Sequence, residues 1–148
     1  RRATKLIPGM KDHPYEERLR RLKMPSLRYQ RARGDMIEAY KHTHGAYTVN
    51  ETLLPRDQGS ATRGHEYKLE KKFCRTATRH NFFSFRVVDS WNRLPSSVVT
   101  APSLNAFKAR LDKAWADHMY QTDLAHPLSP NKLMLEQSSQ AEIQPTGP

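Results

Sequence analysis

The stretch NFFSFRVVDSWNRLP, Asn81 to Pro95, decides the fold of this chain of 148 residues. Within it, Phe83, Val87, Trp91 and Leu94 recur at i, i+4, i+8 and i+11. This spacing places four apolar side chains on one face of a helix. The helix is expected to end before Pro95, because proline disfavours helical backbone at the residue that precedes it.

A second amphipathic helix is predicted downstream of this stretch. Ser103 is a typical N-cap residue, and apolar residues return after it at intervals of three or four positions. These residues are Leu104, Phe107, Leu111, Ala114 and Trp115. We expect the two helices to pack as a hairpin with Trp91, Phe107 and Trp115 at its centre, since large aromatic side chains dominate the burial of small cores.

Upstream, the clearest element is a long helix from Ser26 to about His44. Ser26 is a plausible N-cap, and Gly45 follows the last periodic residue, where glycine commonly ends a helix. Gly34 lies inside this helix and costs about 1 kcal/mol relative to alanine. We therefore expect another helix to approach closely at Gly34.

Two shorter helical segments precede it. Residues 1–7 are interpreted as the last turns of an entering helix, because Pro8 and Gly9 stop a helix. A further helix is predicted from Pro14, which suits the first helical position, to the residues before Pro25.

The middle and the end of the chain carry different signals. Residues 46–64 have the composition of a loop, and residues 65–76 show a rough alternation that is typical of a strand or hairpin arm. After His118 the apolar periodicity lapses among Pro, Ser, Gln and Thr, which predicts a disordered tail.

The predicted fold class is therefore mainly α: a small helical bundle with a short central β-hairpin or strand element and a disordered C-terminal tail. Its predicted parts are a basic helical segment (1–45), a loop and β element (46–80), an aromatic helical hairpin (81–118) and the tail (119–148).

The chain is strongly basic, with a formal net charge of +10, a pI near 10.0 and a mean hydropathy of −0.85. Residues 1–33 hold 11 Lys and Arg against 3 Asp and Glu, and residues 63–93 hold 8 against 3. Such blocks favour polyanionic partners. A membrane is not expected as a partner, because no apolar run approaches the ~20 residues needed to cross a bilayer.

Cys74 is the only cysteine in the sequence. It excludes an intramolecular disulfide framework and a thiolate-rich zinc cluster, which favours a reducing compartment, either the nucleus or the cytoplasm. The sequence begins at Arg1 without an initiator Met or an apolar signal segment, so we expect that an N-terminal part is missing.

Four blocks in order carry a family resemblance. They are RRATKLIPG (1–9), MPSLRYQRARGDMIEAYK (24–41), NFFSFRVVDSWNRLP (81–95) and APSLNAFKARLDKAW (101–115). Over about residues 1–118, the chain resembles the thumb or post-polymerase region of LINE-type (non-LTR) retrotransposon reverse transcriptases. The resemblance implies binding of RNA template, RNA/DNA hybrid or DNA beside upstream polymerase and endonuclease domains.

The resemblance implies that the two basic blocks line two sides of a groove and neutralise phosphates, which gives sequence-tolerant, salt-sensitive binding. The predicted contacts are Arg1, Arg2, Lys5, Arg18, Arg21, Arg28, Arg31, Arg33, Lys68, Lys71, Lys72, Arg75, Arg79 and Arg86. Tyr67 and Phe73 are the candidates for stacking on unpaired bases, because lysines interleave them. Core packing is favoured for Tyr29 and Phe82.

Catalysis and metal binding are not expected of this chain alone. Reverse transcriptases of the family hold magnesium on an Asp-Asp turn and a further Asp, and the sequence has no adjacent Asp pair, so magnesium would belong to the polymerase core. The His and Cys residues lack the spacing of a zinc half-site. They are His42, His44, His65, Cys74 and His80.

Two alternatives to nucleic-acid binding remain open. In the first, the aromatic hairpin docks a protein partner and the positive charge only solubilises the chain; a large exposed aromatic patch would favour this function. In the second, the segment is a decayed element copy without function. Convergence of the two basic blocks on one concave face would favour the nucleic-acid groove.

Overall fold

The computed structural model describes residues 1–48, 53–58 and 64–122, and within them it is mainly helical, as predicted. The described elements are η1 (Ala3–Lys5), α1 (Tyr15–Arg21), α2 (Leu27–Thr43), α3 (Ala77–His80), α4 (Phe83–Asn92), α5 (Ser96–Val99), α6 (Leu104–Ala114) and η2 (Ala116–His118), where η denotes a 3-10 helix.

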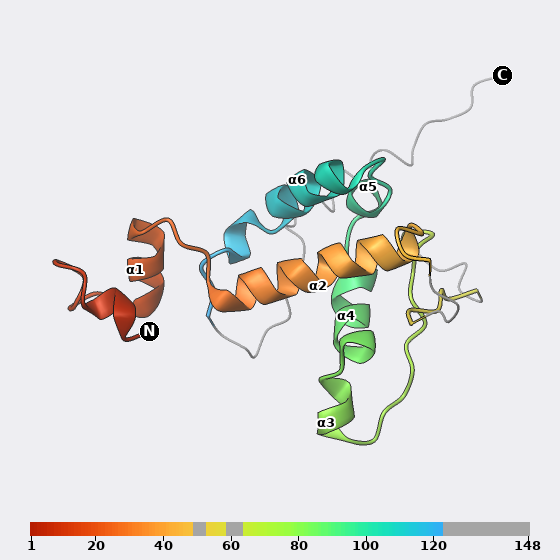
Figure 1. The fold of residues 1–148 in the computed structure, drawn as a ribbon, viewed down its shortest axis with the longest axis horizontal. Coiled ribbons are helices and arrows are strands. Elements are labelled where there is room, and N and C mark those ends of the chain that lie inside the picture. Colours follow the sequence, from red (N-terminus) through yellow and green to blue (C-terminus); the bar gives the residue numbers. More distant parts are fainter. Residues whose placement is uncertain (49–52, 59–63, 123–148) are drawn as a thin grey trace.

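The long helix α2 is the centre of the fold (Figure 1). It begins where the sequence predicts, because the Ser26 hydroxyl accepts a hydrogen bond from the Tyr29 amide at 3.2 Å. It ends before Gly45, whose φ of +70° suits glycine after a helix. α6 runs alongside α2, and α4 crosses it, so both aromatic helices pack on α2.

The predicted aromatic centre is the core of the molecule. Trp91, Phe107 and Trp115 are each 0% exposed. The rings of Trp91 and Phe107 lie 6.0 Å apart, and Tyr40 of α2 stacks on Phe107 at 4.5 Å. α4 and α6 therefore do not form a hairpin by themselves: α5 lies between them in the chain and packs on α6, while α2 is the main partner of both.

The predicted β-hairpin is absent from the described residues, which contain only an isolated antiparallel bridge between Arg56 and Leu69. Around this bridge the Asp57 amide donates to the Lys68 carbonyl and the Glu70 amide to the Pro55 carbonyl, while the Asn92 side chain binds the backbone of Leu69. The Leu69 amide donates to Asn92 Oδ1 at 2.8 Å, and Asn92 Nδ2 donates to the Leu69 carbonyl at 2.9 Å. The backbone groups of residues 68–70 are therefore satisfied by one bridge and one side chain, without a hairpin in the described residues.

The two ends of the described chain also differ from expectation. The entering helix is only the single 3-10 turn Ala3–Lys5. The ordered chain extends past residue 118, because the Ser26 amide donates to the Met119 carbonyl at 2.8 Å and the Ser26 hydroxyl donates to the Gln121 carbonyl at 2.7 Å. The remainder of the predicted tail, residues 123–148, lies outside the described residues.

Candidate nucleic-acid interface

A groove with a volume of about 950 Å³ lies between the first half of α2 and α4. Arg1, Arg28 and Arg31 of the first basic block line it, and Arg86 of the second block lines it from α4. Residues far apart in the sequence therefore meet on one concave face, but only part of each predicted set takes part.

The spacing of residues on α2 explains the wall of this groove. Leu27, Arg31 and Gly34 line the groove and stand at i, i+4 and i+7, so they share one helix face. A Cβ atom built on Gly34 would meet no atom within 4 Å. The predicted close helix approach at Gly34 is therefore wrong, and the missing side chain leaves room in the groove instead.

Arg86 is tied to the opposite wall. Its Nε and Nη2 atoms each donate to the Asp35 carboxylate at 2.8 Å, and its Nη1 donates to the Asn81 carbonyl at 3.0 Å. The hydrogen bonds to Asp35 raise the pKa of the Arg86 guanidinium. This pair joins α4 to α2 across the groove and offsets the charge of Arg86, so the uncompensated positive charge comes from the other wall.

That charge belongs to Arg1, Arg28 and Arg31. Arg31 is exposed, with no hydrogen bond or ion pair among the described residues. Arg28 is half-buried, and its Nη1 atom is buried without a hydrogen-bond partner. Arg1 lies over the Tyr15 ring at 5.4 Å. A buried, unpaired guanidinium nitrogen is costly in a folded protein, so an anion that reached Arg28 would lower that cost.

Two arginines predicted to contact phosphate have structural roles instead. Arg18 is 3% exposed, and its guanidinium donates to the His13 carbonyl at 2.6 Å and the Thr4 hydroxyl at 3.0 Å. Arg33 forms two hydrogen bonds to Asp112. Their side chains are engaged within the fold, so neither is placed to neutralise a phosphate in the groove.

Arg33, Asp112 and Tyr29 form a polar cluster between α2 and α6. The hydrogen bond from Arg33, followed by the one from Tyr29, holds the pKa of Asp112 below its ordinary value. Burial, with the adjoining Asp112 carboxylate, raises the pKa of Tyr29 to about 12. Tyr29 is buried, as expected from the sequence. Its side chain packs between α2 and α6 and is not available to stack on a nucleobase.

The remaining predicted cations do not line this groove. Arg2, at the N-cap of η1, and Lys5, its last residue, are exposed, and Arg21 pairs with Glu17 on α1. The second-block residues lie along the segment from residue 68 to α4, where Lys71 pairs with Asp89 at 2.8 Å. The other members of this second group are the half-buried Lys68 and the exposed Lys72, Arg75 and Arg79.

The two base-stacking candidates have opposite environments. Tyr67 lies in a column of rings: it stacks on His44 at 4.6 Å, His44 stacks on Tyr40, and the Arg56 guanidinium lies over the Tyr67 ring at 4.5 Å. The Tyr67 ring is therefore engaged by His44 and Arg56 within the fold, and its stacking on a base stays a prediction. Phe73, in contrast, is 87% exposed. The core packing expected for Phe82 is wrong, because that side chain is 60% exposed.

Two histidines pack against the core: His65 is buried and His44 is half-buried. Burial lowers the pKa of both His44 and His65 from the ordinary value for the side chain. Nε2 of His65 lies 3.1 Å from the Trp91 carbonyl oxygen, while its Nδ1 is buried without a partner. These histidines serve the packing of the core, and among residues 1–48, 53–58 and 64–122 no group of three or more His, Cys, Asp or Glu could hold a metal ion.

Sequence reasoning did not single out the neutral polar residues of the groove. Gln30, Asn81, Ser90 and Thr122 line it and offer hydrogen-bond donors beside the arginines. Helical periodicity could have placed Gln30 near Gly34 on α2. No sequence signal brings Asn81 and Thr122 to the same place, because tertiary contacts alone unite them.

None of the helices in the described part of the chain is long and apolar enough to span a bilayer. Searches against protein-family models, curated proteins and solved structures gave no match to this chain.

Proposed function

We propose that the chain is a nucleic-acid-binding portion of a LINE-type reverse transcriptase, which grips RNA template, RNA/DNA hybrid or DNA through phosphate contacts. The observation that carries the proposal is the groove of about 950 Å³ that gathers Arg1, Arg28 and Arg31 opposite Arg86. The four sequence blocks that resemble this family support the choice of the family.

The chemistry of the groove suits a sugar-phosphate backbone. Arg28 and Arg31 stand on consecutive turns of α2, and neither has an ion-pair partner among the described residues. Guanidinium groups bind phosphate oxygens through charge-assisted hydrogen bonds. The neutral donors of Gln30, Asn81 and Ser90 suit sugar and phosphate oxygens, which position a polynucleotide without reading its sequence.

The proposal assigns binding to this chain and catalysis to other domains. Polymerisation and target nicking, with the magnesium ions that they need, would belong to polymerase and endonuclease domains, for which this sequence holds no Asp-Asp turn. The chain alone would bind but not synthesise, in the nucleus or the cytoplasm.

The salt dependence of binding tests this function. Fluorescence anisotropy would follow a labelled RNA/DNA hybrid at increasing salt. With three phosphate contacts, log K is expected to fall with log salt at a slope of about −2.7, which is about a 40-fold loss between roughly 50 and 200 mM. Affinity that does not change over this range would contradict the phosphate contacts.

A matched pair of variants locates the contacts. The double variant Arg28→Gln, Arg31→Gln is expected to reduce the slope to about −0.9, because one phosphate contact remains. The control is Arg93→Gln, which removes an exposed arginine at the end of α4 that does not line the groove. Equal effects of the control and the double variant would place the binding outside the groove.

A helical protein-interaction module is the second candidate function. It is favoured by the exposure of Phe73 (87%) and Phe82 (60%), since exposed aromatic rings are typical anchors of protein interfaces. The two functions differ in their response to salt, because an aromatic anchor loses little affinity when charges are screened.

A further inference from the structure

A second, smaller cavity lies on the other flank of α4 from the groove. Its volume is about 320 Å³, within the range of small-ligand sites, and it lies between residues 71–74 and α4. Ser84 and Val88 of α4 line it, whereas Arg86 and Ser90 line the groove. At 3.6 residues per turn, these two pairs point to opposite sides of the helix.

Phe73 forms the exposed rim of this cavity. Its ring has no aromatic or cationic partner among the described residues, and Phe85 of α4 also lines the cavity. Leaving a phenylalanine in water forgoes about 1.5 to 3 kcal/mol of burial free energy. The Phe82 ring, at the N-cap of α4, is also mostly exposed.

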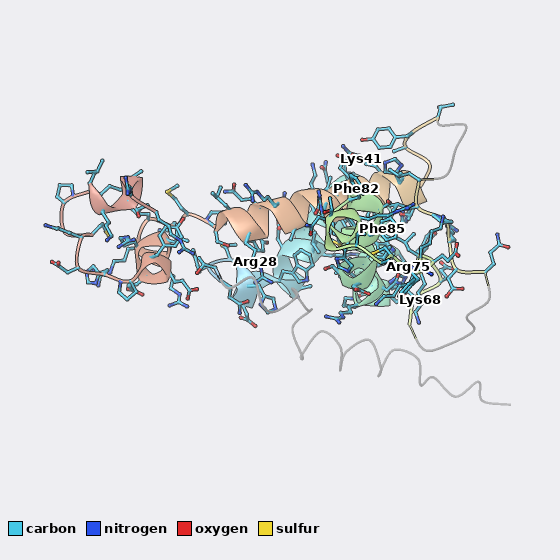
Figure 2. All side chains as sticks on the ribbon, turned by 90° about the horizontal axis from the view of Figure 1, so that it is seen from below. Arg28, Lys41, Lys68, Arg75, Phe82 and Phe85 are labelled. Carbon is cyan, nitrogen blue, oxygen red and sulfur yellow. The ribbon has the colours of Figure 1, made fainter. Side chains whose placement is uncertain are left out.

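The cations around Phe73 are not neutralised by the fold. Lys72 and Arg75 are exposed, and neither has a hydrogen bond or ion pair among the described residues. Lys71 differs, because it pairs with Asp89, and the Arg79 guanidinium lies over the Phe85 ring at 5.6 Å. Figure 2 shows Arg75 at the end of the molecule where α4 lies, away from Arg28 on α2.

An occupant of this site needs one flat apolar face for Phe73 and negative charge for Lys72 and Arg75. We propose that it is an unpaired nucleobase of a single strand, stacked on Phe73, with its neighbouring phosphates on Lys72 and Arg75. This inference rests on the proposed nucleic-acid binding and refines it. Inside a duplex both faces of each base are already stacked, so the site selects a single strand or a strand end.

The test uses the whole chain and one RNA oligonucleotide of 12 nucleotides, measured both as a single strand and paired with its complement. Phe73→Ala is expected to weaken single-strand binding about 5- to 150-fold and to leave duplex binding nearly unchanged. Phe73→Trp is expected to keep single-strand affinity at least at the native level, since the indole ring offers a larger face for stacking. Because Phe73 is exposed, its replacement does not disturb the core, which circular dichroism would verify.

The outcomes separate this inference from the proposed function. Phe73→Ala that leaves single-strand affinity unchanged, or weakens single strand and duplex equally, overturns the stacking site. Phe73→Leu that binds as well as the native chain also overturns it, because an apolar contact then suffices, as expected for a protein-docking ring. If the native chain binds neither form of the RNA, the proposed function itself fails. If the double variant Arg28→Gln, Arg31→Gln binds the duplex more weakly than the native chain does, that function stands.

Discussion

Asp112 on α6 receives two parallel hydrogen bonds from Arg33 on α2, from Nε to Oδ1 at 2.5 Å and from Nη2 to Oδ2 at 2.8 Å. Tyr29 donates a third hydrogen bond to the same carboxylate at 3.0 Å. Bidentate pairs of this kind restrict both partners, so Asp112 fixes the position of α6 along α2.

Replacing this carboxylate by an amide should destabilise the fold. Asp112→Asn keeps the size of the side chain but removes the charge that Arg33 faces, and because the carboxylate is 39% exposed we expect a loss of only about 1 kcal/mol. Urea denaturation measures the loss. Asp117→Asn, at an exposed aspartate of η2, is the control, and equal stability of the two variants would argue against the pair.

The buried histidine His65 should make stability depend on pH. Its pKa in the folded chain is lowered by burial, so below the ordinary pKa of about 6.5 the unfolded chain binds more protons than the folded one. Stability is therefore present above this pKa and falls as the pH is lowered. We expect a lower Tm at pH of about 5 than at about 7.5, measured by thermal unfolding.

Replacing His65 tests whether it causes this pH dependence of Tm. His65→Gln can still donate to the Trp91 carbonyl but cannot take up a proton, so the difference in Tm between the two pH values should shrink. His44, whose pKa burial also lowers, accounts for a remaining part. His80→Gln, at an exposed histidine, should leave the difference as it is in the native chain; a shrinkage there would contradict the role of His65.

Two substitutions of Gly34 distinguish an effect on helix stability from an effect on the space in the groove. Gly34→Ala should stabilise the chain by about 0.5 to 1 kcal/mol, because alanine favours helix and its Cβ meets no neighbour. Gly34→Met should also favour the helix, but its longer side chain extends into the groove. We expect weaker RNA/DNA binding by the methionine variant and little change by the alanine variant. Native-like binding by both would exclude the groove as the binding surface.

Asn92 should be a stabilising residue, since it satisfies both backbone groups of Leu69. Asn92→Ala leaves these groups without partners, which costs about 1 to 3 kcal/mol for each buried group. Asn92→Asp keeps an acceptor for the Leu69 amide but loses the donor to its carbonyl, so its unfolding free energy should lie between the other two. Asn105→Ala, at an exposed site on α6, should have little effect, and an equal loss there would contradict this role.

The sequence predicted the features that depend on neighbouring residues. The Ser26 and Ser103 hydroxyls cap the helices that follow them, and Gly45 ends α2, because capping is decided within one turn. The apolar face containing Trp91 was also predictable, since helical periodicity alone defines it.

Long-range pairing set the limits of sequence reasoning. From the sequence, Arg33 and Arg86 were expected to be free cations. Their carboxylate partners, Asp112 and Asp35, are 79 and 51 residues away in the chain. The alternation of residues 65–76 suggested a hairpin, but the described pairing is a single bridge to Arg56, and the Leu69 amide and carbonyl bind the Asn92 side chain. A count of basic residues therefore overstates the charge of the groove.

Thr122 donates to the Glu16 carboxylate and lines the groove, while Gln121 is bound to the Ser26 hydroxyl at the start of α2. Position 122 is consequently suitable for attaching a proximity probe. A photo-crosslinking amino acid introduced there would report directly on what occupies the groove, whereas a bulky reporter fused at the same point would compete with it.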